Sequence, residues 1–258
     1  MGSTLRRARK WLLPATLMAG LLVWSMAARW GNLPSFLLPS PGAVARRLWL
    51  LFLDGSLARH AAATFLEVLC GLLLGLSVAF GLGYLLAKSR VAERLLSPYI
   101  VATQSIPVVA IAPLLVIWFG PGPLSKVLIA ALIVFFPVLV NTIVGLRSVP
   151  IDLRDLLRSL RATGWQTFVK LELPASSPVL LGGLKIGATL AVIGAVVGEF
   201  VGSDRGLGFL VNLGRGLYDT SLVFAAIFVL VCMAMALYGG VALLERWLLK
   251  WREPARRG

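Results

Sequence analysis

Long stretches without a charged residue constrain this sequence more than any other feature. The run VLIAALIVFFPVLVNTIVGL, Val127–Leu146, carries no charge over 20 residues. A helix needs roughly 20 apolar residues to cross the hydrocarbon core of a bilayer. The whole chain is 59% hydrophobic and only 14% charged, whereas soluble domains average about 45–50% and about 25%. The sequence therefore indicates an integral membrane protein.

Six such runs predict about six membrane-spanning helices. Backbone groups in lipid must form their hydrogen bonds within the segment, so helices are the expected form, and the sequence lacks the period-2 alternation of membrane strands. The predicted spans are residues 11–28, 64–87, 97–119, 124–146, 177–199 and 220–245. We expect an all-α polytopic membrane protein in which residues 1–258 form a single transmembrane domain. A cleaved signal is the alternative for the first run, but its length and flanking residues favour a retained helix.

The excess of basic residues predicts the orientation of the spans. The formal net charge is +14, and cytoplasmic loops of membrane proteins are enriched in Lys and Arg. With six spans and the N-terminus inside, 18 of the 25 Lys and Arg residues fall on the cytoplasmic side. We therefore expect a multi-pass protein of the cell (inner) membrane with both termini cytoplasmic. Membrane lipid, and not nucleic acid, is the partner that this charge indicates.

A polar segment, residues 150–174, interrupts the apolar sequence between the fourth and fifth spans. Good helix formers from Asp155 to Ala162 predict one short helix, and Thr163-Gly164 ends it. A second short helix is expected over Trp165–Leu171, with Pro174 as its stop. The apolar members of the segment that offer a docking face are Leu156, Leu157, Leu160, Trp165, Phe168 and Leu171. Docking on a partner and lying flat on the membrane are both compatible with this pattern.

Polar residues beside proline breaks are candidates for a permeation pathway. Pro107 and Pro113 each remove a backbone donor from the third span, and Gln104 and Ser105 lie next to the first break. Polar groups at membrane depth usually face the bundle interior or a water-filled path. A local kink with ordinary packing explains the prolines equally well.

Asn141 and Glu199, in the fourth and fifth spans, complete the candidate pathway set of Gln104, Ser105, Pro107, Asn141 and Glu199. An ionisable residue in a span is a functional candidate. For Glu199 an interfacial ion pair with Arg205 is the favoured alternative, and Glu67 at the start of the second span is interpreted in the same way. Small residues at four-residue spacing, as in Gly71 and Gly75, predict close helix packing within the bundle, with a subunit interface as the alternative.

No enzyme signature occurs in the sequence. His60 is the single histidine, and both Cys70 and Cys232 lie in apolar spans. The chain contains no phosphate-binding loop, metal-ligand spacing or nucleophile elbow. We expect neither a cofactor nor a metal in this chain, and no catalytic residue.

The polar segment resembles the cytoplasmic loop of the membrane subunits of type I ATP-binding-cassette (ABC) importers. That loop has the form E-A-A-x3-G-x9-I-x-L-P. Its spacing is matched in full by Asp155-Leu156-Leu157, Arg161, Leu171 and Leu173-Pro174. The residue types depart from the pattern, because Asp replaces Glu, two Leu replace two Ala, and Arg161 stands at the Gly position. Gly164, three residues later, is an alternative site for the turn.

Further blocks are similar to the nitrate, sulfonate, taurine and thiamine-precursor permease group of this family. They are Leu38–Val44, Gln104–Lys126, Phe135–Val149 and Gly202–Val211. The block that starts at Gln104 most resembles permeases of vitamin precursors, such as the thiamine pyrimidine or a riboflavin-type compound. Sulfonate, taurine and nitrate remain alternative substrates.

The resemblance implies a mechanism and a set of partners. Two permease copies, expected to form a homodimer, would form the pore. Two ABC ATPase subunits would bind ATP and Mg²⁺ and receive the coupling helix. An extracytoplasmic binding protein would deliver the solute. The residues implied in coupling are Asp155, Leu156, Leu157, Arg161, Gly164, Leu171, Leu173 and Pro174. An ion-coupled secondary transporter and a non-transporting membrane scaffold are the alternative functions.

Overall fold

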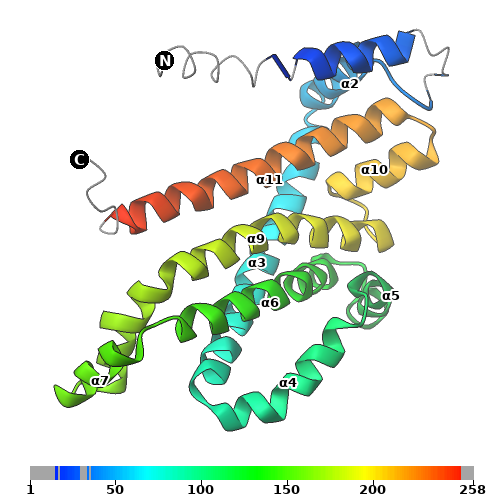
Figure 1. The fold of residues 1–258 in the computed structure, drawn as a ribbon. Coiled ribbons are helices and arrows are strands. Elements are labelled where there is room, and N and C mark those ends of the chain that lie inside the picture. Colours follow the sequence, from blue (N-terminus) through cyan, green and yellow to red (C-terminus); the bar gives the residue numbers. More distant parts are fainter. Residues whose placement is uncertain (1–14, 17, 30–33, 35, 251–258) are drawn as a thin grey trace, which may run out of the picture.

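The computed structural model describes residues 15–250, apart from residues 17, 30–33 and 35. Every regular element in these described ranges is helical (Figure 1). The helices are α2 (Pro41–Leu53), α3 (Ser56–Lys88), α4 (Arg90–Gln104), α5 (Val108–Phe119), α6 (Pro123–Arg147), α7 (Ile151–Ser159), α8 (Gly164–Thr167), a π-helical segment (Phe168–Glu172), α9 (Leu173–Val201), α10 (Leu207–Gly216) and α11 (Thr220–Leu248). An apolar helix, Met18–Arg29, precedes them.

Three long helices form the core of the bundle. Helix α6 packs along both α3 and α9 (Figure 1). The contacts between α3 and α6 advance in the same direction along both helices, from Gly71 near Ala130 to Gly83 near Thr142. These two helices are therefore parallel. Contacts of α6 with α9 run in opposite directions, so α9 is antiparallel to α6.

Glycines make these close approaches possible. A Cβ atom at Gly71 would lie 2.5 Å from Cβ of Ala130, and one at Gly194 would lie 2.5 Å from Cα of the same alanine. Without side chains at these two positions, the backbones of α3 and α9 both approach α6, and close approach is what small residues provide in lipid. The small-residue pairs predicted from the sequence therefore pack within one chain, as the bundle interpretation expected.

Helices α2, α10 and α11 lie on one side of this core, and α4 and α5 lie on the other (Figure 1). Helix α11 packs against α9, α10 and α2, and α2 lies at the upper edge of the molecule in Figure 1. Ser40 caps α2 by accepting a hydrogen bond from the N–H of Ala43 at 3.2 Å, and Asp219 caps α11 by accepting one from Leu222 at 3.0 Å. Both α2 and α10 lie between predicted spans, in segments for which the sequence predicted no helix.

Among the described residues, four helices are long and apolar enough to cross a membrane: α3, α6, α11 and the continuous helix Gly164–Val201 that contains α9. Helices α4 and α5 are long and apolar enough only when taken together, and they are bent by 92° relative to each other. They therefore form either a broken span or a re-entrant loop. Of the predicted first span, residues 11–14 and 17 lie outside the described residues, and residues 18–28 belong to the short apolar helix Met18–Arg29.

The third predicted span, 97–119, lies within the bent pair α4 and α5, with its break at the first of the two prolines singled out in the sequence. The bend lies at Ser105–Pro107, where Pro107 has extended backbone angles of φ −62° and ψ 118°. Proline disfavours helical geometry in the residue before it, which explains a break at this position. Pro113, the second expected break, lies inside α5 without ending it.

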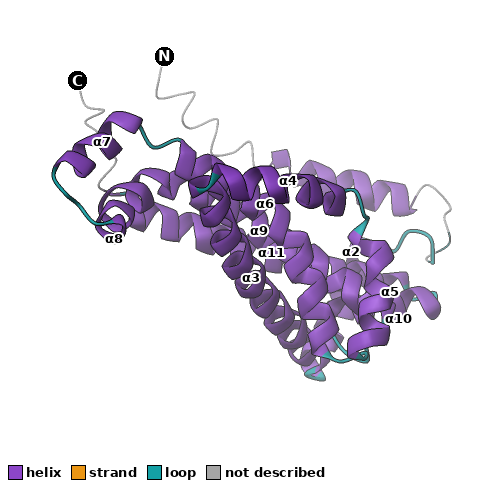
Figure 2. Ribbon diagram, turned by 90° about the horizontal axis from the view of Figure 1, so that it is seen from below, coloured by secondary structure: helices purple, strands orange, loops and turns teal. Residues whose placement is uncertain are grey.

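The polar segment lies at one end of the bundle. Figure 2 shows α7 and α8 at the end opposite to α5 and α10. The carboxyl-terminal ends of α3 and α6 and the beginning of α9 meet at this same end, because α7 follows α6 directly and Lys88 of α3 contacts Glu172.

Candidate functional site

Helix α7 of the polar segment ends in a Schellman motif. The N–H of Ala162 donates to the carbonyl of Leu157 at 3.0 Å, and the N–H of Arg161 donates to Arg158 at 2.9 Å. Arg161 has a φ of +56°. This is the left-handed conformation that the motif requires and that glycine adopts at the lowest energetic cost. The turn is therefore made at the position where the family pattern has glycine, although this chain has arginine there.

Gly164 does not make that turn. It is the first residue of α8, after Thr163, which caps the helix. The hydroxyl of Thr163 accepts a hydrogen bond from the N–H of Gln166 at 3.2 Å, and the amide oxygen of Gln166 accepts one from the N–H of Thr163 at 2.8 Å. This reciprocal pair is a capping box, so the second helix begins here because of Thr163 and Gln166.

Pro174 was expected to stop the second helix, and this expectation was wrong. The helix continues from α8 through a π-helical segment, Phe168–Glu172, into α9, with Pro174 in the first turn of α9. Proline lacks an N–H and crowds the carbonyl four residues earlier. The wider π-helical turn, in which the N–H of Leu173 donates to Phe168, accommodates the proline without ending the helix.

Part of the predicted docking face is exposed. Leu156, Leu160 and Trp165 are 55%, 68% and 72% exposed, while Leu157 and Leu171 are half-buried. Asp155 is also exposed, and its carboxylate lies 3.8 Å from the guanidinium of Arg158. Large apolar side chains on a short polar segment form a surface suited to a partner or a membrane interface.

A buried carboxylate ties the polar segment to the spans. Glu172 is completely buried, and its Oε1 lies 2.5 Å from Nζ of Lys88 and 3.2 Å from Nε of Arg154. Arg154 also donates from Nη2 to the carbonyl of Leu146, at 2.5 Å. Glu172 thus joins α7 to the ends of α3 and α6 at the place where α9 begins.

Two further contacts brace the same end. The ring of Phe168 lies edge-on to Tyr84 of α3, with centroids 5.2 Å apart, and 5.7 Å from Trp165. Arg147, at the end of α6, donates from two nitrogens to the carboxylate of Glu93 in α4, at 2.7 and 2.6 Å. The polar segment is therefore held on a rigid platform made by several helix ends.

The predicted pathway residues do not form one cluster. Gln104, Ser105 and Pro107 are exposed and lie at the bend between α4 and α5. Asn141 is half-buried in α6, donates to the carbonyl of Pro137 at 2.7 Å, and packs where Gly183 of α9 passes. Glu199 lies elsewhere, near the end of α9.

Glu199 is buried and caps helix α10. Its Oε1 accepts a hydrogen bond from the hydroxyl of Thr64 at 2.6 Å, and its Oε2 accepts one from the N–H of Gly208. The N-terminus of a helix offers unpaired N–H groups and a partial positive charge, both of which favour a carboxylate. The expected ion pair with Arg205 is not among the contacts of Glu199 in the described part of the chain, so that interpretation was wrong.

The glycines of the GSDRGLGFL block are explained by the same contact. A Cβ atom at Gly206, where φ is +112°, or at Gly208 would collide with the Glu199 carboxylate. Thr64 completes the arrangement, because its Oγ1 also accepts from the N–H of Leu207 at 2.7 Å. The tight turn before α10 is therefore shaped to receive Glu199.

A second buried carboxylate lies beside this cluster. Glu67, in α3, is 3% exposed, and its Oε1 lies 3.7 Å from Nζ of Lys126. Lys126 is itself buried and donates to the carbonyl of Pro121 at 3.1 Å. The side chains of Glu67 and Glu199 also contact each other. Two carboxyl groups and one ammonium group are thus buried where α3, α6 and α9 meet.

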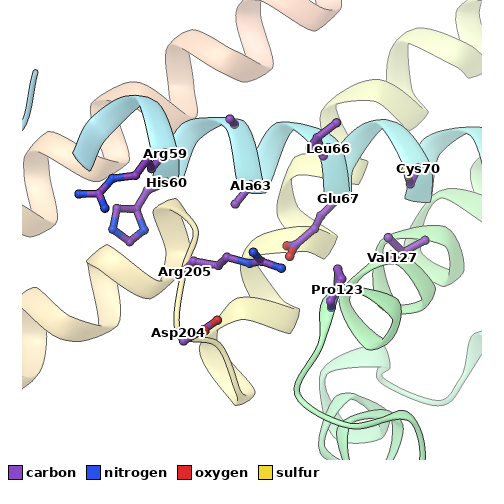
Figure 3. A pocket seen from close by; sticks show the side chains of 11 residues that line it. Arg59, His60, Ala63, Leu66, Glu67, Cys70, Pro123, Val127, Asp204 and Arg205 are labelled. Carbon is purple, nitrogen blue, oxygen red and sulfur yellow. The ribbon is translucent and has the colours of Figure 1, made fainter. Parts of the chain in front are cut away.

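A cavity of about 680 Å³, which we call the Glu67 pocket, opens beside these residues. Its lining residues are Arg59, His60, Ala62, Ala63, Leu66, Glu67, Cys70, Pro123, Val127, Asp204 and Arg205. Figure 3 shows the guanidinium of Arg205 reaching across the pocket toward the carboxylate of Glu67. His60 is held in place because its Nδ1 accepts from the N–H of Gly206 at 3.0 Å. In the described part of the chain, no group of three or more His, Cys, Asp or Glu residues forms a metal site.

The ion-paired cluster of Glu172, Lys88 and Arg154 was not predicted from the sequence. Glu172 occupies an unspecified position of the loop pattern, between Leu171 and Leu173. An acid flanked by apolar residues at the start of a span was the available signal. Its partners come from distant parts of the sequence, so their identity depended on the packing of the helices.

Comparisons with known proteins agree with this architecture. Residues 71–250 match the family described as the binding-protein-dependent transport system inner membrane component. The chain is 46% identical to the riboflavin transport system permease protein RibX of Chloroflexus aurantiacus, over 93% of this chain and 89% of RibX. It is 38% identical to the formylaminopyrimidine transport permease protein ThiX of Halalkalibacterium halodurans, over 90% of this chain and 92% of ThiX.

The fold is also similar to a solved structure. A chain of the MetNI methionine ABC transporter, in an inward-facing crystal form, superposes with a TM-score of 0.65 at 19% identity, covering 76% of this chain and 97% of that chain. The match by sequence covers more than half of the chain, and the all-helical arrangement agrees with it. This chain therefore belongs to the family of binding-protein-dependent transport system inner membrane components, the permease subunits of ABC importers.

Proposed function

We propose that this permease moves a small heterocyclic solute of the riboflavin or aminopyrimidine kind across the inner membrane, driven by a separate ABC ATPase. Two relatives with high identity over nearly their full length, RibX and ThiX, carry names of such solutes. An extracytoplasmic binding protein delivers the solute, and ATP and Mg²⁺ bind to the ATPase and not to this chain.

The polar segment is the part of the chain that receives the ATPase. The single observation that carries this assignment is the pairing of an exposed apolar face, Leu156, Leu160 and Trp165, with the buried anchor Glu172. An exposed face offers area for docking, and a buried ion-paired anchor transmits displacement to the spans, because packed elements move as units. Asp155, Leu157, Arg161, Gly164, Leu171, Leu173 and Pro174 complete the coupling set.

A second permease copy completes the pore, and we infer a homodimer. Helix α4 has no buried residue in this chain, and its exposed apolar side chains include Val91, Leu95, Tyr99 and Val101. A second copy covers part of this face, and the lipid covers the rest. We infer that the polar segment and both termini lie in the cytoplasm, because the distribution of basic residues favours this orientation.

Co-purification and uptake test this function together. The chain is expressed with its ATPase and binding protein, and Leu160→Asp is compared with Leu217→Asp. These side chains are 68% and 64% exposed, and Leu217 follows α10, at the end of the bundle opposite to the polar segment (Figure 2). A charge at the centre of a docking face should abolish ATPase co-purification, whereas the control should retain it.

Uptake into proteoliposomes then tests the solute. The wild-type complex should accumulate riboflavin or a formylaminopyrimidine when ATP is supplied, and taurine should not compete. Normal co-purification of the ATPase with Leu160→Asp would remove the assignment of the polar segment. Accumulation of taurine alone would overturn the proposed class of solute.

A further inference from the structure

The end of the Glu67 pocket at which Glu67 lies is at membrane depth. Helix α3 has 33 residues, which corresponds to about 50 Å at about 1.5 Å per residue. The hydrocarbon core of a bilayer is only about 30 Å thick, so roughly 10 Å of a centred α3 extends beyond it on each side. Glu67 is the twelfth residue of α3, about 17 Å from its start, and therefore lies inside the apolar layer. A carboxyl group at this depth needs a reason to be there.

Internal contacts account for only one of the two oxygens of Glu67. Oε1 faces Nζ of Lys126 at 3.7 Å, but Oε2 has no hydrogen-bond donor among the described residues although it is buried. By contrast, both oxygens of Glu199 accept a hydrogen bond, from Thr64 and from Gly208. A buried acceptor without a donor costs stability, so Oε2 of Glu67 is suited to a donor supplied from the pocket.

The lining of the pocket indicates what kind of molecule it suits. Two guanidinium groups, Arg59 and Arg205, are balanced by two carboxyl groups, Glu67 and Asp204. A balanced lining does not favour a simple anion such as nitrate, which would leave the carboxylates unpaired. Leu66 and Val127 add apolar wall to the same cavity. Donors, acceptors and apolar wall together suit a flat polar ring system with both N–H and C=O groups.

We propose that the Glu67 pocket is a solute-binding station on the permeation route, where Oε2 of Glu67 accepts a hydrogen bond from a ring N–H or amino group of a neutral heterocyclic solute. Arg205 lies across the pocket and donates to a carbonyl group of the same solute (Figure 3). The volume of about 680 Å³ is within the range of small-molecule sites. This inference rests on the proposed function, and it adds a site and a recognition chemistry to it.

Native cysteines provide a matched pair of reporters. Cys70 is exposed, lines the pocket and lies three residues after Glu67, close to one helical turn away. Cys232 is also exposed, but it lies in α11 among apolar residues such as Phe65, Val229 and Met233. The pocket residue should therefore react with a charged, membrane-impermeant methanethiosulfonate, whereas Cys232 should react only with a membrane-permeant reagent.

Labelling is measured on the assembled permease, ATPase and binding-protein complex in proteoliposomes, with the chain carrying Cys232→Ser. The charged reagent should label Cys70, and riboflavin should protect it. At a riboflavin concentration of about ten times its Kd, about a tenth of the sites remain open, so labelling should slow about ten-fold. A bulky adduct on Cys70 should stop uptake. In Cys70→Ser the complex should still assemble, and its uptake should no longer be sensitive to the reagent.

Substitution of Glu67 tests the recognition chemistry. In Glu67→Gln the new amide group can donate to the neighbouring Glu199 carboxylate, so the bundle should remain intact. The KM for riboflavin uptake should rise about ten-fold, as expected for the loss of one hydrogen bond to a charged group, with little change in kcat. Cys232→Ser, in α11 and outside the pocket, should leave KM unchanged.

Each outcome decides the question. Labelling of Cys70 only by the permeant reagent would show a pocket that faces lipid, and would overturn the proposal. Uptake of riboflavin or formylaminopyrimidine without protection of Cys70, or with an unchanged KM in Glu67→Gln, would overturn the site while leaving the proposed function intact. A complex that transports neither solute with ATP would remove the proposed function, and the site with it.

Discussion

Nε of Arg154, in the short helix α7, lies 3.2 Å from Oε1 of Glu172, at the base of the long helix α9. Lys88, the last residue of α3, reaches the same oxygen at 2.5 Å. One completely buried carboxylate thus links the polar segment to two of the core helices. Movement of α7 cannot leave α3 and α9 in place without breaking an ion pair, and this makes Glu172 a positioning residue for coupling.

Replacement of Glu172 should uncouple the segment from the spans. We expect Glu172→Gln to lower the free energy of unfolding by about 1–3 kcal/mol, because two cations lose a buried charged partner. The ATPase should still co-purify, since the exposed docking face is unchanged, but less solute should be moved per ATP hydrolysed. The check is parallel measurement of uptake and ATP hydrolysis in proteoliposomes. Arg158→Gln, which alters only an exposed pair with Asp155, is the control, and equal loss in both variants would contradict the role of Glu172.

Arg161 should be replaceable by glycine with a gain in stability. Its φ of +56° lies in the left-handed region. A residue with a β-carbon is destabilised there by about 1–2 kcal/mol of steric strain, which glycine avoids. We expect Arg161→Gly to stabilise the fold by about 1 kcal/mol and to preserve ATPase binding. Hydrogen exchange of the amides of α7 measures this effect directly.

Tyr218 provides a comparison for Arg161. It has the same φ of +56° at the end of α10, where Tyr218 and Asp219 donate to Arg215 and Gly214 in the same pattern. Tyr218→Gly should therefore also stabilise the protein. Destabilisation by glycine at Arg161 alone would indicate that the arginine side chain has a structural role that its contacts do not reveal.

Gly206→Ala should destabilise the turn before α10. A β-carbon there would collide with the carboxylate of Glu199, and the φ of +112° is strained for any residue except glycine. We expect a loss of at least about 2 kcal/mol from strain and overpacking. Gly216→Ala, at the other end of α10, is the control, because no atom lies within 4 Å of its added β-carbon. Thermal unfolding of both variants in the same detergent is the measurement, and similar midpoints would refute the account.

Glu199 and Thr64 should act as one unit. Glu199→Gln keeps one acceptor oxygen but presents an NH₂ group to the N–H of Gly208 or the hydroxyl of Thr64, so one hydrogen bond is lost. We expect a destabilisation of about 1–3 kcal/mol, and a similar loss for Thr64→Val. The double variant should lose much less than the sum of the two, because residues in one hydrogen-bond network are not additive. Full additivity would show that the two side chains do not cooperate.

The helices that cross the bilayer could be predicted from the sequence because their length and lack of charge leave no other state in lipid. The fourth and sixth predicted spans, 124–146 and 220–245, differ from α6 and α11 by at most three residues at either end. The short helices α2 and α10 were missed, since neither is long or apolar enough to give that signal. The break at Pro107 was expected from the sequence, but the angle of 92° between α4 and α5 was not, because a proline shows where a helix can break and not the angle that follows.

The sequence by itself determined that this chain is a helical membrane protein with one polar segment of coupling type, because hydrophobic length and motif spacing are local properties of a chain. Only the tertiary structure decided which buried charges meet. Glu67 and Lys126 are far apart in the sequence, as are Lys88 and Glu172, and they are brought together by the parallel packing of α3 on α6 and the antiparallel packing of α9. The close approach of the glycine-bearing helix faces therefore decides which charged side chains become partners. This pairing cannot be predicted from a local sequence pattern.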